Sequence, residues 1–94
     1  MLLTAASASA TAVTNTHAYK LGFHAGCLAG YSNGHSDGVT DCLEYGKTGV
    51  LKEIPKPQIK NNWSKNYVKG FIDGFNNKYV TGYNNGRYGC LNKK

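Results

Sequence analysis

The sequence has no run of about 18 apolar residues and no Gly-X-Y period, although 12 of its 94 residues are glycine. These absences exclude a membrane-spanning helix and a collagen-like fibre. Acidic residues are scarce, 5 against 11 Lys and Arg, and there are only 2 prolines. A chain of 94 residues fits one small domain and is too short for a two-domain enzyme.

The positive charge lies in the second half of the chain. Residues 1–46 carry one Lys against three acidic residues, a net −2, whereas residues 47–94 carry nine Lys and one Arg against two acidic residues, a net +8. We expect the second half to attract an anionic surface or an acidic partner, including the acidic half of another copy. Nucleic acid is disfavoured, because ten of the eleven cations are Lys rather than Arg.

The first sixteen residues are rich in Ala and Ser. Ala recurs at positions 6, 8, 10 and 12, the small-x-small spacing that signal peptidases read. Residues 1–16 are therefore interpreted as the remnant of a signal peptide, with a flexible tail as the alternative, and residues 17–94 as a single domain. Three cysteines suit an oxidising compartment, and Asn62-Trp63-Ser64 makes Asn62 a glycosylation candidate or a helix cap. We predict a secreted or cell-envelope protein.

An internal repeat organises this domain. A shift of 48 residues lays 18–43 on 66–91 without a gap, and 9 of the 26 positions are identical. In both repeats glycine recurs every fourth residue, although Lys78 interrupts the second series, and an aromatic row follows directly after the glycine row. We interpret this pattern as an internal duplication.

A four-residue period is close to one helical turn, so each repeat predicts an α-helix with a glycine groove beside an aromatic ridge. Ridges of one helix fit grooves of another, with steep or right-handed crossing, and backbones that approach closely. The predicted fold is all-α: two such GX3 helices joined by an extended, Pro-containing connector at 44–62, and oligomeric. The predicted interface residues are Gly22, Gly26, Gly30, Gly34, Gly38, Gly70, Gly74, Gly82, Gly86, Phe23, Tyr31, Phe71, Phe75, Tyr79 and Tyr83.

Two alternatives compete with the helical interpretation. Each interior glycine disfavours a helix by about 1 kcal/mol relative to alanine, so the segments could be disordered, or strands with every glycine on one face. Asn84-Asn85-Gly86 favours a turn. A helical fold therefore requires burial of the aromatic side chains.

The cysteines bear on topology. Cys42 and Cys90 are equivalent in the two repeats, so parallel helices would bring them level and permit a disulfide, whereas antiparallel helices would separate them. The connector is long enough for either arrangement. Cys27 is a further disulfide candidate, and one of the three cysteines is left over in any single pairing.

Motifs for chemistry are weak. Gly46-Lys47-Thr48 lacks the earlier glycine of a phosphate-binding loop, because Asp41 stands there. His24 and Cys27 have i, i+3 spacing for one zinc ion, but further ligands would have to come from elsewhere. We therefore predict no metal, no cofactor and no enzymatic activity.

The glycine series from Gly22 to Gly38, with Phe23 and Tyr31 beside it, resembles the deca-GX3 repeat of adaptor proteins that serve cytosolic iron–sulfur cluster assembly. The resemblance covers residues 18–42 and, less well, 66–90. That family uses GX3 helices for protein–protein association, which implies pairing through Gly22 to Gly38 and Gly70 to Gly86. The leading functional hypothesis is an exported, self-associating structural or interaction module. The alternative is a cationic secreted effector that acts on anionic membranes or other anions.

Overall fold

The computed structural model describes residues 13–92 of the chain. Two long α-helices, α2 (His17–Tyr45) and α3 (Lys65–Leu91), are joined by the short 3-10 helix η1 (Gly46–Thr48) and an extended connector, residues 49–64. No strand occurs between residues 13 and 92. The prediction of two long helices around an extended connector is confirmed, except that α2 runs on to Tyr45, inside the stretch that the sequence assigned to the connector.

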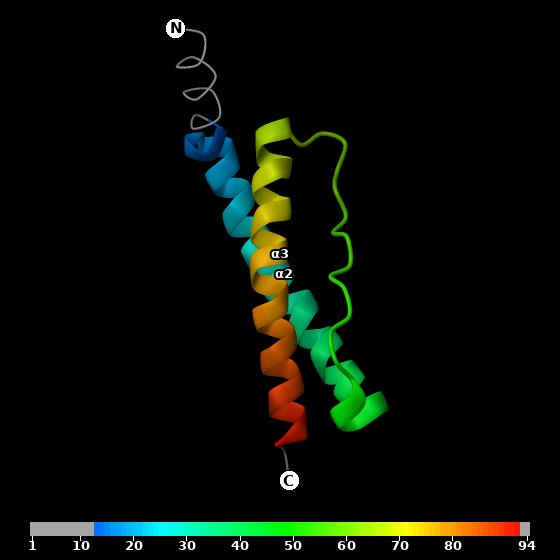
Figure 1. The fold of residues 1–94 in the computed structure, drawn as a ribbon. Helices are drawn as coiled ribbons and strands as arrows, with labels where there is room; N and C mark the ends of the chain where they lie inside the picture. The colour runs from blue at the N-terminus through cyan, green and yellow to red at the C-terminus, as the bar shows by residue number, and fades with distance from the viewer. Residues whose placement is uncertain (1–12, 93–94) are drawn as a thin grey trace, which may run out of the picture.

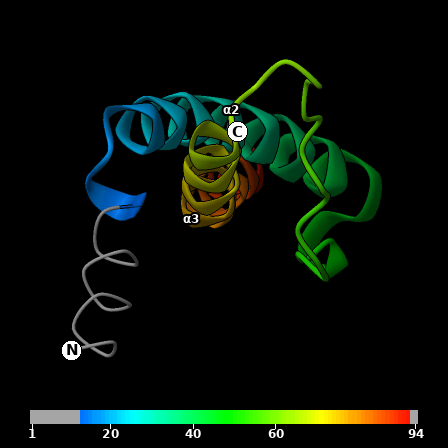
Figure 2. The ribbon, with the colours of Figure 1, turned by 90° about the horizontal axis from the view of Figure 1, so that it is seen from above.

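The two helices lie side by side and run parallel, because the connector leads the chain from the end of α2 back to the level of its start (Figure 1; Figure 2). Their register follows the 48-residue shift, since Gly22 faces Tyr67 while Gly70 faces Tyr19. Four such contacts occur twice with the roles of the helices exchanged, as in the isologous interface of a homodimer. The contact of Gly30 with Phe75 has no glycine counterpart, because Lys78 stands at the equivalent position of α3. The helix pair therefore has an internal pseudo-two-fold relationship.

The helices cross rather than run strictly alongside. In Figure 1, α2 passes behind α3 from upper left to lower right, which is a right-handed crossing. A four-residue repeat exceeds 3.6 residues per turn, so its contact row drifts around the helix and requires this sense of crossing.

Local signals fix the ends of the helices. Thr16 and Ser64, which are equivalent under the 48-residue shift, cap α2 and α3, and each side-chain oxygen accepts a hydrogen bond from the backbone N–H three residues later, 3.2 Å away. Gly46 ends α2 with a φ of 63°, a conformation that glycine adopts without a Cβ penalty, and its N–H bonds the carbonyl of Cys42.

The core lies on one side of α3. Phe75, Tyr79 and Tyr83 are each 2% exposed, and Ala25 and Ala29 of α2 pack against them. Asn84-Asn85-Gly86 lies inside α3 rather than in a turn, because Gly86 is buried against α2. Burial of large aromatics, worth about 1.5–3 kcal/mol each, offsets the poor helix propensity of the glycines.

Candidate interaction surfaces

The glycine grooves of both helices are filled by the backbone of the other helix. At Gly30 an added Cβ would lie 2.8 Å from the Cα of Phe75, where ordinary contact begins near 3.4 Å. At all nine groove glycines the atom nearest to the added Cβ is a carbonyl oxygen of the facing helix. Those oxygens therefore face the glycine Cα–H groups, the geometry of Cα–H···O contacts at helix interfaces. The predicted interface glycines thus lie buried between α2 and α3 of one chain.

Beside each groove stands a row of larger side chains, and the two rows differ in burial. The α3 ladder comprises Trp63, Tyr67, Phe71, Phe75, Tyr79 and Tyr83, with successive ring centroids 4.9–6.5 Å apart. The α2 ridge comprises Tyr19, Phe23, Cys27, Tyr31 and His35, and Cys27 interrupts its stacking. The last four rings of the ladder are 2–8% exposed, whereas Tyr31 in the ridge is 39% exposed.

Four tyrosine hydroxyls hydrogen-bond across the helix pair by one positional rule. The 48-residue shift assigns to each tyrosine an equivalent position on the other helix. The hydrogen-bond partner of the tyrosine lies six residues after that position. Three donate to a carboxylate, and the fourth accepts from an amide. The pairs are Tyr19 with Asp73 (2.7 Å), Tyr31 with Asn85 (3.1 Å), Tyr79 with Asp37, and Tyr83 with Asp41.

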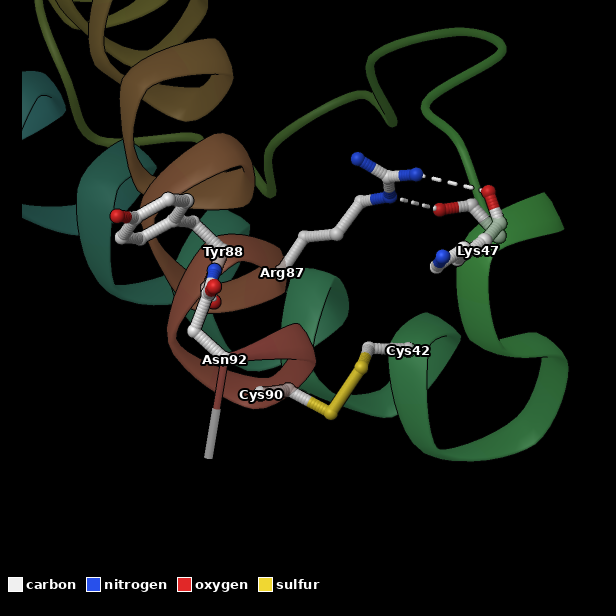
Figure 3. The surroundings of a disulfide bond; sticks show 7 residues. Cys42, Lys47, Arg87, Tyr88, Cys90 and Asn92 are labelled. Carbon is white, nitrogen blue, oxygen red and sulfur yellow. Dashed lines mark hydrogen bonds between the residues drawn. A yellow bond between two sulfur atoms is a disulfide. The ribbon is translucent and has the colours of Figure 1, made fainter. Parts of the chain in front are cut away.

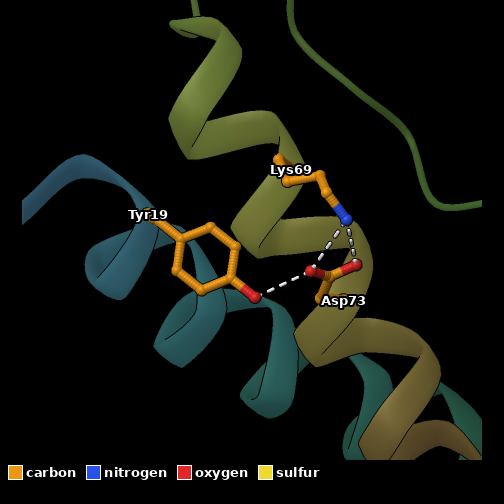
Figure 4. Close-up of polar contacts among 3 residues, drawn as sticks. All are labelled: Tyr19, Lys69 and Asp73. Carbon is orange, nitrogen blue, oxygen red and sulfur yellow. Dashed lines mark hydrogen bonds and ion pairs between the residues drawn. The ribbon is translucent and has the colours of Figure 1, made fainter. Parts of the chain in front are cut away.

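These bonds perturb the phenols that donate them. Burial, followed by the hydrogen bond to Asp37, raises the pKa of Tyr79 well above its usual value of 10.0. Burial, followed by the hydrogen bond to Asp41, raises the pKa of Tyr83 to about 12. The hydrogen bond to Asp73 raises the pKa of Tyr19, whose acceptor also pairs with Lys69 at 3.2 Å (Figure 4).

The connector covers the α3 ladder. Leu51, Ile54 and Pro57 are partly buried, while the residues between them are exposed, and the first two pack against the ladder. Burial of every third residue is the pattern expected when a polyproline II segment, with three residues per turn, lies along a surface. Pro55 and Pro57 favour the polyproline II conformation, so the sequence of the connector itself favours the extended form in which it lies on the ladder.

Two interactions hold the helices together at their C-terminal ends. Cys42 and Cys90 form a disulfide with a Cα–Cα distance of 6.2 Å, as the parallel alternative predicted (Figure 3). Cys27 is the free cysteine. Arg87 donates through Nε to the carbonyl of Gly49 (2.6 Å) and through its terminal nitrogen to that of Lys47 (2.8 Å). The disulfide holds the end of α2 against α3, and Arg87 holds η1 and the start of the connector there.

The remaining candidates from the sequence lie apart from this core. Asn62 is exposed in the turn before α3. Among residues 13–92 no group of three or more His, Cys, Asp or Glu side chains is placed to hold a metal ion. His24 and Cys27 instead line a shallow pocket of about 350 Å³ on α2, together with Tyr19, Lys20 and Phe23. The proposed signal-peptide remnant lies largely outside the described residues.

Sequence reasoning missed the hydroxyl acceptors Asp37, Asp41, Asp73 and Asn85, and the connector as a cover. The spacing between each tyrosine and its acceptor can be read from the sequence. It indicates a hydrogen bond only when the two helices are known to be parallel and paired in the register of the 48-residue shift. The spacing of Leu51, Ile54 and Pro57 was a visible signal, but it does not say which surface they cover.

Comparisons with protein-family models, with curated proteins and with solved structures give no match to this chain. The resemblance of the glycine pattern to deca-GX3 adaptor proteins stays a prediction. In the part of the chain that the structure describes, no helix is both long and apolar enough to cross a bilayer.

Proposed function

We propose that this protein is a small exported structural or interaction module that associates with further copies of itself. Because the glycine grooves are filled within the chain, association uses the outer surface of a preformed helix pair. The Cys42–Cys90 disulfide supports export, because disulfides persist mainly in oxidising compartments.

The observation that carries the proposal is the complementarity of two exposed surfaces. At the end of α2, Leu43 and Tyr45 are 75% and 62% exposed on either side of Glu44. Between the connector and α3 lies a groove of about 630 Å³ lined by Ile54, Pro55, Lys56, Pro57, Ile59, Ile72 and Asn76. The apolar end of one copy fits the apolar groove of the next, and Glu44 meets the positive charge of Lys56.

Such a contact joins two different surfaces, so it is heterologous and can repeat from copy to copy. This is the head-to-tail association expected from the unequal charges of the two halves. Steering by opposite charges mainly raises the rate of encounter, whereas burial of Leu43 and Tyr45 supplies affinity.

The test is light scattering on the oxidised protein across a concentration series. We expect masses above the 10.2 kDa of one chain, falling to one chain in Leu43→Ser and Tyr45→Ser. Leu28→Ser, at a site 63% exposed on the middle of α2, is the matched control and leaves the mass unchanged. Glu44→Lys weakens association, and mixing it with Lys56→Glu restores it.

A single-chain mass at every concentration would contradict the proposal. So would an equal loss of association in Leu28→Ser, because the contact would then not involve the end of α2.

A second candidate function is action on anionic membranes, favoured by the exposed side chains of Lys52, Lys56 and Lys60 along the connector. It predicts leakage from vesicles that contain anionic lipid, falling as salt is added. Leakage from the monomeric Tyr45→Ser variant at the wild-type level would favour this candidate over self-association.

A further inference from the structure

The two aromatic rows are equivalent in the repeat, but the connector covers only the α3 ladder, and among residues 13–92 the α2 ridge keeps an open pocket. The pocket on α2 is lined by Tyr19, Lys20, Phe23, His24 and Cys27. A shift of 48 residues converts these into Tyr67, Val68, Phe71, Ile72 and Phe75 on α3. This is the region that the connector covers, because Ile54 packs against the ladder there and lines a groove together with Ile72.

The occupied site shows what kind of chain fits such a row. The connector lies along the ladder in an extended form and packs Leu51 and Ile54 against it, while Pro57, three positions further on, is also partly buried. Proline-containing segments bind aromatic surfaces in this way because their extended conformation is already formed before binding. An occupant of the α2 ridge would have the same backbone form and spacing.

The rim of the α2 pocket differs in charge from the equivalent region of α3. Lys20 and His24 stand where α3 has Val68 and Ile72, and both side chains are exposed. Lys69, whose side chain is 60% exposed, lies close by, joined to Tyr19 through Asp73 (Figure 4). A carboxylate beside the apolar positions of the occupant would be attracted here, whereas a lysine would be repelled.

The charge argues against the chain's own connector as the occupant in a second copy. That segment carries Lys52, Lys56 and Lys60, all exposed, against Glu53 alone. The part of the chain that the structure describes offers no other extended segment, so we assign the occupant to a different protein.

We propose that the α2 ridge, at the pocket formed by Tyr19, Phe23 and Cys27 with Lys20 and His24 on its rim, binds an extended, proline-containing, acidic segment of a partner protein, as the connector binds the α3 ladder. The surface is separate from the end of α2 and the connector groove used for self-association.

The experiment titrates the oxidised, full-length protein into labelled synthetic peptides and follows fluorescence anisotropy. The first peptide has the sequence of residues 49–62 with Lys52→Glu, Lys56→Glu and Lys60→Glu, and the second has the natural sequence. We expect the acidic peptide to bind about tenfold more tightly than the natural one at low salt, and added salt to reduce this difference. Failure of the acidic peptide to bind, or equal binding of both peptides at low salt, overturns the proposal.

Two variants locate the site. Phe23→Ala lowers the affinity for the acidic peptide about tenfold, whereas Val80→Ala, at an exposed apolar site on α3, leaves it unchanged. The double variant Lys20→Glu, His24→Glu changes only exposed side chains and reverses the preference, so that the natural peptide binds more tightly. An unreversed preference, or an equal loss in Val80→Ala, overturns the proposal.

These experiments distinguish failure of this inference from failure of the self-association proposal. If Phe23→Ala dissolves an assembly and the acidic peptide does not bind, a second copy covers the ridge, which overturns this inference and moves the self-association contact from the end of α2 to the ridge. If the acidic peptide binds a protein that stays monomeric, this inference stands and self-association fails.

Discussion

Tyr83 on α3 donates its phenolic hydrogen to the carboxylate of Asp41 on α2, 42 residues earlier in the chain. The phenol ring is 2% exposed, so this bond joins a buried ring to a partly buried acid. Tyr79 makes the equivalent bond to Asp37 one turn away. Two neutral phenols are therefore part of the contact between the helices, and their ionisation works against it.

The first prediction is loss of stability in alkali. In the unfolded chain tyrosine ionises near pH 10, whereas in the fold the pKa of Tyr83 is about 12 and that of Tyr79 is also raised. The stabilisation is fully present below pH 10 and is lost as the pH rises toward 12, because the unfolded state releases protons that the folded state retains. Urea unfolding at pH 8, 10 and 11 measures the loss.

The control for this prediction is the double variant Tyr79→Phe, Tyr83→Phe. It removes both titrating groups while keeping their rings in the core, so its stability depends less on pH between 10 and 12. A wild-type stability that stays constant across that range would show that both phenols ionise as they do in the unfolded chain.

The second prediction concerns one chemical change at two helical glycines. Gly30→Ala places a Cβ 2.8 Å from the Cα of Phe75, and the backbone of α3 cannot move away without separating the helices, so we expect a loss of about 3 kcal/mol or more. At Gly89, also within α3, an added Cβ meets nothing within 4 Å. Gly89→Ala therefore stabilises the helix by about 0.5–1 kcal/mol.

Chemical denaturation of both variants measures the two effects. Opposite signs are expected, because helix propensity favours alanine at both sites and only the close approach of the helices opposes it. Destabilisation of similar size at both positions would mean that the two backbones are not in contact at Gly30.

Much of the fold could be predicted from the sequence because glycine and aromatic residues recur with a helical period. The shift of 48 residues that makes Cys42 and Cys90 equivalent also gives the register of the helix pair. Helix direction could not be predicted, since a connector of this length permits both topologies. That the connector covers the α3 row rather than the α2 row could not be predicted either, because nothing in the sequence around Leu51 and Ile54 says which aromatic row they contact.

The third prediction concerns the disulfide. Cys42 and Cys90 are separated by 48 residues, and closing a loop of this size stabilises the fold by about 4 kcal/mol in the chain-entropy account. Thiol titration of the unreduced, denatured protein gives one free thiol per chain, that of Cys27. Cys42→Ala with Cys90→Ala lowers the stability by up to this amount, whereas Cys27→Ala has a much smaller effect. Three free thiols without reduction would refute the pairing.

The fourth prediction tests whether the connector stabilises the helices that it joins. Ile54→Ser removes an apolar side chain that packs against the α3 ladder, and we expect a loss of about 1–3 kcal/mol. Ile59→Ser is the matched control in the same connector, because Ile59 is 39% exposed and not among the residues packed on the ladder. It should change stability by less than about 1 kcal/mol. Thermal unfolding followed by the near-ultraviolet signal of Trp63 and the tyrosines measures both variants. Equal effects at the two positions would show that the connector is a passive tether and that the ladder is buried by α2 alone.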